Sequence, residues 1–390
     1  MRTALTSLNI AGLVLALLFI SLILLKKDKQ LRDYLLAFFI FLLGTFLLIK
    51  YVFQFDLYNT YPIIIYLDIY YWVLLGPTLY IYTLVSTRGE NHFRKNYLFT
   101  LIPAALVTIC FSQYIFGNAA DLFNNWDNLP TIAIVGVYIW LWNSPVFYLL
   151  TILAIRKHQK SIKNHFSYSK TIDLNWLNYL SHGFAIFILF IITRGIIRNL
   201  SGWDLSIDNY SLSLATAFIY IFGIGFFGYR QRGIFDNYKD IAIPINNREM
   251  QKTSDIKEDR YQLSYQKSGL NDAEAQRIIN KLERVMQSEE LYLESELYLA
   301  ALAEKVDVST HKLSQVINEY LNKNFFDFVN EYRIERAKEF LLDPAYNQLK
   351  IVSLAYDSGF SSKSTFYTTF KKAEGITPAE YRKKYQQKTA

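Results

Sequence analysis

Hydrophobic residues are concentrated in the first part of the chain, in long and nearly uninterrupted runs. Up to about Gly228 the sequence consists mostly of Leu, Ile, Phe and Tyr, whereas from Tyr229 onward it is mixed and charged. Crossing the hydrocarbon core of a bilayer as a helix takes about 20 apolar residues. Seven runs approach that length, near 8–25, 33–53, 62–86, 97–117, 131–155, 179–198 and 211–228. The pattern predicts a seven-span transmembrane helical bundle followed by a water-soluble part.

The polar part changes character once. Residues 229–272 contain the stretch NNREMQKTSDIKEDR and few large apolar side chains, which is typical of a linker. Beyond it, NDAEAQRIINKLERVMQ places apolar residues on one helical face, with Asn271 or Asp272 as the N-cap. We therefore predict a transmembrane domain at 1–228, a linker at 229–272 and a helical domain at 273–390.

The helical domain begins with a helix-turn-helix pattern. LAALAEKVDVSTHKLSQVINEYL predicts a short helix, a turn at DVS and a second helix that Ser309 caps. A long amphipathic helix, FFDFVNEYRIERAKEFLLD, follows and ends before Pro344. The alternation of apolar and polar positions thus predicts an all-α domain.

The same pattern occurs a second time after the long helix. KIVSLAYDSGFSSKSTFYTTFKK again predicts a short helix, a turn and a second helix. Gly359 can adopt the positive φ that the turn requires, and Ser361 or Ser362 is the predicted cap. The soluble all-helical domain is therefore predicted to hold two helix-turn-helix units.

The second helix of each unit carries polar side chains away from its apolar face. In DNA-binding helix-turn-helix proteins this is the helix that enters the major groove. The alternative is that these faces are merely solvated, but two units joined by one stiff helix favour DNA binding. The candidate DNA-binding residues are His311, Lys312, Ser314 and Gln315 in the first unit and Lys363, Ser364, Tyr367, Thr368 and Lys371 in the second.

The second unit has a pattern that fixes many positions at once. It comprises Ile351, Ala355, Gly359, Phe360, Phe366, Phe370, Lys371, Gly375, Thr377, Pro378, Tyr381 and Arg382. With these residues, and over roughly 280–387, the chain resembles the DNA-binding domain of the AraC family of bacterial transcription regulators. The first unit looks like the form found in regulators of Bacteroidota. The whole architecture resembles membrane-embedded members of the family, in which a multi-span domain replaces a soluble sensor.

The resemblance implies that the two reading helices enter successive major-groove segments on one face of promoter DNA. By position in the motif, the residues that would read or flank bases are His311, Ser314, Gln315, Lys363, Ser364, Tyr367 and Thr368. The first reading helix departs from the family where an Arg that pairs with guanine often stands, because it offers His311 and Gln315, and Gln prefers adenine. RNA polymerase and a second copy of the chain, as a homodimer, are further candidate partners.

Charge predicts the orientation of the spans. The chain has a net charge of +7, and the first, third and fifth loops hold twelve basic residues, whereas the intervening loops hold none. Cytoplasmic loops of membrane proteins carry an excess of Lys and Arg. We therefore predict an N-terminus outside, the lipid bilayer of a bacterial inner membrane as the location, and the helical domain in the cytoplasm.

Ionisable residues inside spans are costly and are therefore functional candidates. Asp68 lies six residues into the third predicted span, and Arg194 lies near the outer end of the sixth, at a similar depth. We predict this pair as a candidate sensor site. It is either an ion pair that holds the bundle together or a site that binds a polar ligand.

The sequence contains no catalytic or metal-binding pattern. The single cysteine, Cys110, excludes an internal disulfide, and the five histidines lack metal-ligand spacing. GIGFFG matches the dinucleotide fingerprint, but it lies in an apolar run without a preceding strand. We predict a non-enzymatic one-component regulator without metal or cofactor, which senses an unidentified small-molecule or membrane signal. The alternative is a membrane-anchored transcription factor, its bundle an anchor or transporter-like, that proteolysis of the linker releases.

Overall fold

The computed structural model describes residues 2–55, 57, 60–61, 63–88, 92–117, 128–168, 175–201, 206–230 and 270–389. Throughout this part of the chain the predicted all-helical architecture is confirmed, and the β-structure there is limited to one isolated bridge between Phe166 and Tyr298. Most of the predicted linker, residues 231–269, lies outside the described residues.

The chain divides into two compact units, each made of two stretches of sequence. The first comprises Met1–Arg156 and Leu174–Phe235, and the second comprises Lys157–Asp173 and Asp236–Ala390. A segment between two of the predicted spans therefore belongs to the same unit as the helical domain.

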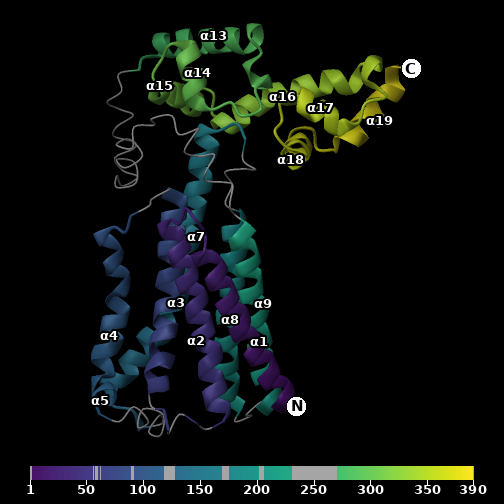
Figure 1. Ribbon diagram of the computed structural model, residues 1–390. Coiled ribbons are helices and arrows are strands. Elements are labelled where there is room, and N and C mark those ends of the chain that lie inside the picture. Colours follow the sequence, from purple (N-terminus) through teal and green to yellow (C-terminus); the bar gives the residue numbers. More distant parts are fainter. Residues whose placement is uncertain are drawn as a thin grey trace. The chain divides into compact units, whose positions relative to one another are not determined.

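The helices that overlap the predicted spans are labelled in Figure 1, and the end of one of them, α7, belongs to the second unit. Their bounds are α1 Arg2–Leu24, α2 Leu31–Gln54, α3 Ile63–Arg88, η2 Lys95–Leu101, α4 Ile102–Cys110, α5 Ser112–Ile115, α7 Thr131–His165, α8 Asn175–Ser201 and α9 Ser206–Arg230. Four helical stretches, in α1, α2, α3 and α7, are long and apolar enough to cross a membrane. Shorter apolar helices occupy the other three predicted spans, and the count of seven stays a prediction.

The fourth predicted span is not one continuous helix. It begins as a 3₁₀ helix, η2, continues as α4 and is interrupted at Phe111 before α5. Pro103 lies in the first turn of α4, where its missing N–H is tolerated. Proline therefore marks the change from 3₁₀ to α-helical geometry.

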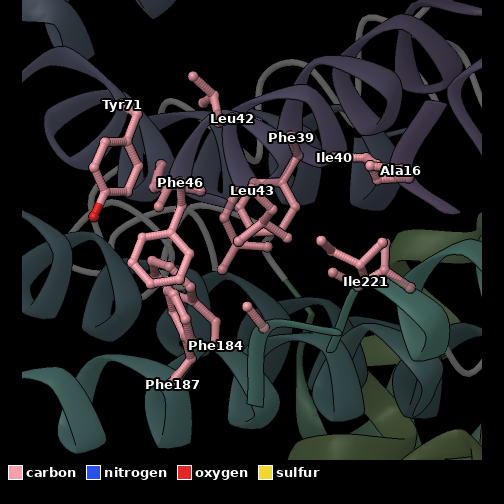
Figure 2. Packing of buried hydrophobic residues seen from close by; sticks show 14 of the residues in the cluster. Ala16, Phe39, Ile40, Leu42, Leu43, Phe46, Tyr71, Phe184, Phe187 and Ile221 are labelled. Atoms are coloured by element: carbon pink, nitrogen blue, oxygen red, sulfur yellow. The ribbon is translucent and has the colours of Figure 1, made fainter. Parts of the chain in front are cut away.

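The core of the first unit is formed by aromatic and aliphatic side chains of α1, α2, α3, α8 and α9 (Figure 2). Phe39 and Phe46 of α2 meet the rings of Phe184 and Phe187 of α8 edge to face, with centroids 5.9 and 5.4 Å apart. The quadrupoles of aromatic rings favour this arrangement. Large apolar side chains also cover outward faces of the helices, among them Leu17, Leu149, Leu153, Ile186, Leu189 and Ile219. Helices that are apolar on both sides are suited to lipid.

A proline joins α3 to α7. Pro77 lies inside α3 and has no N–H, so the carbonyl of Val73, one turn earlier, lacks its helical donor. The buried amide of Asn143 in α7 supplies the donor, because its Nδ2 lies 2.7 Å from the Val73 oxygen. The Ser144 hydroxyl donates to the neighbouring carbonyl of Trp72 at 3.2 Å. The two helices are thus held together by hydrogen bonds that a bilayer could not replace.

The GIGFFG stretch lies within α9, which continues through it as a helix. A Cβ at Gly225 would lie 2.1 Å from the ring of Phe19 in α1. This glycine therefore permits close contact between two helices, as small residues do in membrane bundles.

The second compact unit contains two hydrophobic cores that share one long helix, α16. Its elements are α13 Asp272–Ser288, η4 Leu291–Leu293, α14 Leu299–Val306, α15 Thr310–Gln315, η5 Val316–Tyr320, α16 Phe325–Leu342, η6 Pro344–Tyr346, α17 Ile351–Asp357, α18 Lys363–Glu374 and α19 Pro378–Thr389. The start of α16 contributes Phe325 and Val329 to the first core, and its second half contributes Ala337 and Leu341 to the other. The helix thereby fixes the spacing of the two cores.

Candidate nucleic-acid interface

The first helix-turn-helix unit consists of α14 followed by α15 and η5. Asp307 ends α14 in the left-handed conformation, with a φ of 56°. As predicted, Ser309 begins the next helix, and its hydroxyl accepts a hydrogen bond from the N–H of Lys312 at 3.2 Å. Beyond Gln315 the helix widens into the π-helical turn η5. Turns of this kind are rare and are frequent at functional sites.

Two of the predicted DNA-binding residues of this unit lie on its outer surface. His311 is exposed, and Ser314 is half-buried and accepts a hydrogen bond from the amide of Asn318 at 3.1 Å. Lys312 is also half-buried, but its Nζ lies 2.6 Å from the carboxylate of Glu274 in α13. Lys312 would therefore have to leave an acidic partner before it could contact a phosphate.

Gln315 differs from the expectation that it faces away from the core. Its side chain is only 5% exposed, and its Nε2 donates to the Glu319 carboxylate at 2.9 Å. Gln315 directly precedes η5, in which hydrogen bonds span five residues, as the bond from the N–H of Leu321 to the carbonyl of Val316 shows. The 3.6-residue helical period correctly placed Leu313, Val316 and Ile317 in the core. It was wrong for Gln315, whose buried amide is satisfied by Glu319 one turn later.

The second helix-turn-helix unit consists of α17, a turn and α18. Gly359 has a φ of 86° at the turn, and a Cβ there would lie 2.4 Å from the carbonyl oxygen of Tyr292, so the position excludes side chains on two grounds. Ser362 is the cap, because its hydroxyl accepts a hydrogen bond from the N–H of Thr365 at 3.2 Å. Phe366 and Phe370 of α18 are fully buried in the second core.

The predicted DNA-binding residues of α18 form one exposed face. The members that are exposed are Lys363, Ser364, Thr368 and Lys371. Tyr367 is half-buried, packs edge to face on Phe366 with ring centroids 5.6 Å apart, and has the Nζ of Lys363 5.5 Å from its ring centroid. The face combines cations, hydroxyls and one anchored aromatic ring. Cations and hydroxyls bind the phosphates of DNA, and hydroxyls and rings can contact base edges.

The last helix, α19, directly follows α18 in the sequence and carries further positive charge. Thr377 and Glu380 form a capping box: the N–H of Thr377 donates to the Glu380 carboxylate at 2.7 Å, and the N–H of Glu380 donates to the Thr377 hydroxyl at 3.3 Å. Tyr381 packs on Phe370, with ring centroids 5.3 Å apart. Lys383 and Lys384 are exposed. The second core therefore fixes the backbone of α19, from which the two exposed lysines project.

Arg333 lies between the two cores and was not predicted as a special residue. Its side chain is fully buried; Nε donates to the Tyr292 carbonyl and Nη2 to the Glu294 carbonyl, each at 2.6 Å. Its guanidinium lies 5.8 Å from the ring centroid of Phe360, next to the turn of the second unit. Burial lowers the pKa of Arg333 to about 9, so the side chain is charged at neutral pH. The same buried cation thus contacts both the segment at η4, which belongs to the first core, and the turn of the second helix-turn-helix unit.

The candidate sensor residues lie in the helical bundle of the first compact unit. Asp68 is half-buried in α3, where the charged group that acts on it is Lys50 of α2. The Nζ of Lys50 lies 5.4 Å from the ring centroid of Phe46. Arg194 lies in α8, and its side chain is outside the described residues, so the predicted Asp68–Arg194 pair stays a prediction. The sequence analysis missed Lys50, although the same rule for charges inside spans identifies it.

Metal binding has no support in the described part of the chain, where no group of three or more His, Cys, Asp or Glu side chains is placed to hold an ion.

Comparison with known proteins gives matches in the second compact unit, in the part that contains both helix-turn-helix units. A family described as helix-turn-helix domain matches residues 302–384. A relative named an uncharacterised HTH-type transcriptional regulator, from Staphylococcus aureus (strain COL), is 38% identical over 109 residues, which cover 27% of this chain and 14% of the relative. The regulator YtdP of Bacillus subtilis (strain 168) is 29% identical over 111 residues, covering 28% and 14%. The chain thus spans about 14% of the length of these relatives.

A solved structure, of a protein of unknown function from Listeria innocua, also matches. It is 30% identical, with 27% of this chain and 94% of that chain covered and a TM-score of 0.24.

Proposed function

We propose that this chain, whose C-terminal helix-turn-helix domain is of the AraC type, is a membrane-bound transcription regulator that binds promoter DNA sequence-specifically with both units. The observation that carries the proposal is the outer face of α18, where Lys363, Ser364, Thr368 and Lys371 are exposed on a helix that is capped and anchored from behind. The second helix of such a unit is the one that enters the major groove. The names of the relatives, which are HTH-type transcriptional regulators, support the same function.

The two reading helices contribute differently in the proposed complex. In the second unit, Ser364, Tyr367 and Thr368 meet base edges, and Lys363 and Lys371 meet phosphates. The first unit offers His311 and Ser314 directly. The two residues with acidic partners, Lys312 and Gln315, contact DNA only after they exchange those partners for it.

The helical bundle of the first compact unit is proposed to lie in the inner membrane of a bacterium, where DNA is accessible from the membrane surface. The four long apolar helices, their apolar outward faces and the basic residues of alternate loops support this placement. The N-terminus would be outside and the DNA-binding domain in the cytoplasm. The bundle would then be the sensor of a one-component regulator, in which no phosphotransfer is needed.

The signal is proposed to enter at the charged residues within the bundle. Asp68 remains the candidate, now together with Lys50, which acts on it, and with Arg194 as predicted. A polar ligand or a change in the membrane would act on these charges, because an ionisable group inside a bilayer is costly unless it is paired.

Mapping the DNA sites of the full-length protein in its host tests the function. We expect a limited set of promoter sites, with changed transcripts from the adjacent genes in a deletion strain. The double variant Ser364→Ala, Thr368→Ala should accumulate in the membrane but lose these sites. A map without enriched sites would contradict the proposal.

Two further measurements test the membrane placement. A reporter that is active only in the periplasm should be active when fused after Trp126, which lies outside the described residues, and silent after His165. The reverse result would contradict the orientation. An immunoblot that reveals a soluble C-terminal fragment of about 120–160 residues would instead favour release by proteolysis, which concentrates in exposed linkers.

A further inference from the structure

We propose that the DNA-binding domain carries a docking site for the segment that directly follows α7, Phe166–Ser167–Tyr168, and that the bundle controls DNA binding through this contact. The segment lies within the second unit, although the sequence places it between two predicted spans. The docking itself is independent of what the domain binds, whereas its regulatory role rests on the proposed function.

Backbone and side-chain hydrogen bonds hold the segment in place. Phe166 forms an antiparallel bridge with Tyr298. The N–H and the hydroxyl of Ser167 both donate to the carbonyl of Leu297, at 3.1 and 2.6 Å. The carbonyl of Ser167 accepts a hydrogen bond from the buried amide of Asn330 at 3.1 Å. All polar groups of Ser167 thus find partners within the DNA-binding domain.

Apolar contacts reinforce these hydrogen bonds. Phe166, Ser167 and Tyr168 are all buried, and the two rings meet edge to face with centroids 5.7 Å apart. They form a small cluster with Ile162 at the end of α7 and with Tyr298. Three consecutive buried residues are unusual in a connecting loop, which normally runs over the surface. The burial therefore marks a specific contact.

Arg333 connects the docked segment to the segment at η4 and to the turn of the second helix-turn-helix unit. Its Nη1 donates to the Ser167 carbonyl and its Nη2 to the Ser167 hydroxyl, each at 3.1 Å. The same guanidinium holds the carbonyls of Tyr292 and Glu294. If the segment leaves, a buried cation loses two acceptors, and the junction between the units is less firmly fixed. DNA binding with both reading helices then costs more ordering.

The other part of α7 is fixed just as specifically. Asn143 in its first half completes the hydrogen bonds of α3 at Pro77, and α3 carries Asp68. α7 is helical from Thr131 to His165 and contains Pro145, two residues beyond Asn143, and the missing N–H of this proline gives the helix a site at which it can bend. A shift of α3 against its neighbours would thus be passed along α7 to the docked segment. The element with two arrangements is the segment itself, which is either docked or released.

Cysteine labelling in membranes tests the docking with the full-length chain. In a Cys110→Ala background, Ser167→Cys places a near-isosteric thiol in the docked segment, and Ser161→Cys places one on an exposed position of α7 as the matched control. We expect a water-soluble maleimide to label position 167 at least about tenfold more slowly than position 161, because labelling requires local opening. Adding Tyr298→Ala should accelerate labelling at 167 and leave 161 unchanged. Equal labelling of the two positions in the parent background would overturn the docking.

A binding measurement tests the regulatory role. The probe is a DNA duplex that the full-length wild-type protein enriches from a random-sequence pool. Ser167→Ala removes two hydrogen bonds without altering the domain's own residues, so we expect it to bind this duplex at least about threefold more weakly. The matched control Ser161→Ala should bind as wild type does. Equal affinity of Ser167→Ala and wild type would overturn the regulatory role.

The two experiments separate the present inference from the proposed function. If the wild-type chain enriches no duplex while position 167 is protected, the docking stands and DNA binding fails. If position 167 is labelled freely while the wild type enriches a duplex, DNA binding stands and the docking inference is wrong.

Discussion

The two helix-turn-helix units are built alike on α16, but their charge is opposite in sign. Residues 271–324 contain ten acidic and six basic residues, whereas residues 344–390 contain three acidic and eight basic residues. Affinity for the phosphate backbone comes largely from Lys and Arg that neutralise it. The second unit is therefore expected to supply most of the DNA affinity.

The difference extends to individual side chains. On the first reading helix Lys312 and Gln315 have acidic partners, whereas the corresponding face of α18 is open. The first unit also contributes the segment at Leu297 and Tyr298, on which residues 166–168 dock. We therefore expect the second helix-turn-helix unit to contribute most to holding DNA, and the region of the first to respond to a signal from the rest of the chain.

The largest effect is expected from replacing Arg333, which links the segment at η4 to the second helix-turn-helix unit. Arg333→Ala removes the charge-assisted hydrogen bonds to the carbonyls of Tyr292 and Glu294 as well as those to Ser167, and should lower the free energy of unfolding of the domain by about 3–5 kcal/mol. Arg336→Ala, on the same helix, loses a partly exposed pair with Glu339 and a contact with the ring of Phe340, 4.6 Å from the guanidinium to the ring centroid, and should cost at most about 2 kcal/mol. Thermal unfolding of the purified full-length variants measures both values. Similar losses would show that Arg333 does not tie the units together.

A smaller effect distinguishes the reading helices. Tyr367→Ala should weaken binding to a selected operator duplex by about 1–3 kcal/mol, as the loss of a good base contact does. Gln315→Ala should have a clearly smaller effect, because the Gln315 amide is buried and bound to Glu319. Fluorescence anisotropy gives both affinities, and unfolding curves show whether each variant is folded. A larger loss for Gln315→Ala would reverse the assignment of the two units.

The salt dependence sharpens the comparison further. Lys371 is exposed on α18, so Lys371→Ala should weaken all sequences alike and reduce the slope of log K against log salt by about 1. Lys312→Ala should reduce the slope by clearly less, because Lys312 pairs with Glu274 in the free protein and contacts DNA only after it leaves that partner. Titrations of a nonspecific duplex at several salt concentrations give the slopes. Equal slopes for the two variants would argue against unequal phosphate contacts.

The smallest effect concerns acid stability. Hydrogen bonds from the backbone N–H and the hydroxyl of Thr377 lower the pKa of Glu380. Because the folded pKa lies below the unfolded value, the stabilisation is present above the unfolded pKa and is lost as the pH falls through the folded pKa. Glu380→Gln should remove this pH dependence from α19. The cap of α13 is the neutral amide of Asn271, which accepts from the N–H of Glu274 at 2.7 Å and has no such dependence.

Amide hydrogen exchange of α19 and α13, followed from pH 6 downward, measures this difference. Loss of protection that begins at the same pH in both helices would contradict it.

Much of the architecture follows from local sequence. Hydrophobic length predicted where most helices of the bundle lie. Short-range chemistry predicted the cap Ser309, the positive φ of Gly359 and a second cap at Ser361 or Ser362, of which the structure has Ser362. The burial of Gln315 was not predictable from periodicity, because it goes together with a hydrogen bond to the side chain of Glu319 that the apolar pattern does not reveal.

Contacts between distant residues set the second limit. Ser167 and Leu297 are 130 residues apart, and no local pattern relates them. Arg333 did leave a signal: it stands in the four-residue register of Val329 and Ala337, where a buried cation is unexpected. A charge on an apolar stripe thus indicates a specific partner before that partner is known.

Pro77 has a consequence for the order in which the chain is assembled. The ribosome completes α3 long before it reaches Asn143, and until then the carbonyl of Val73 has no partner from α7. Hydrocarbon offers no substitute donor. In the proposed membrane setting, a nascent chain that stops before α7 would carry an incomplete α3, so biogenesis of the bundle depends on retaining an early helix until a later one arrives.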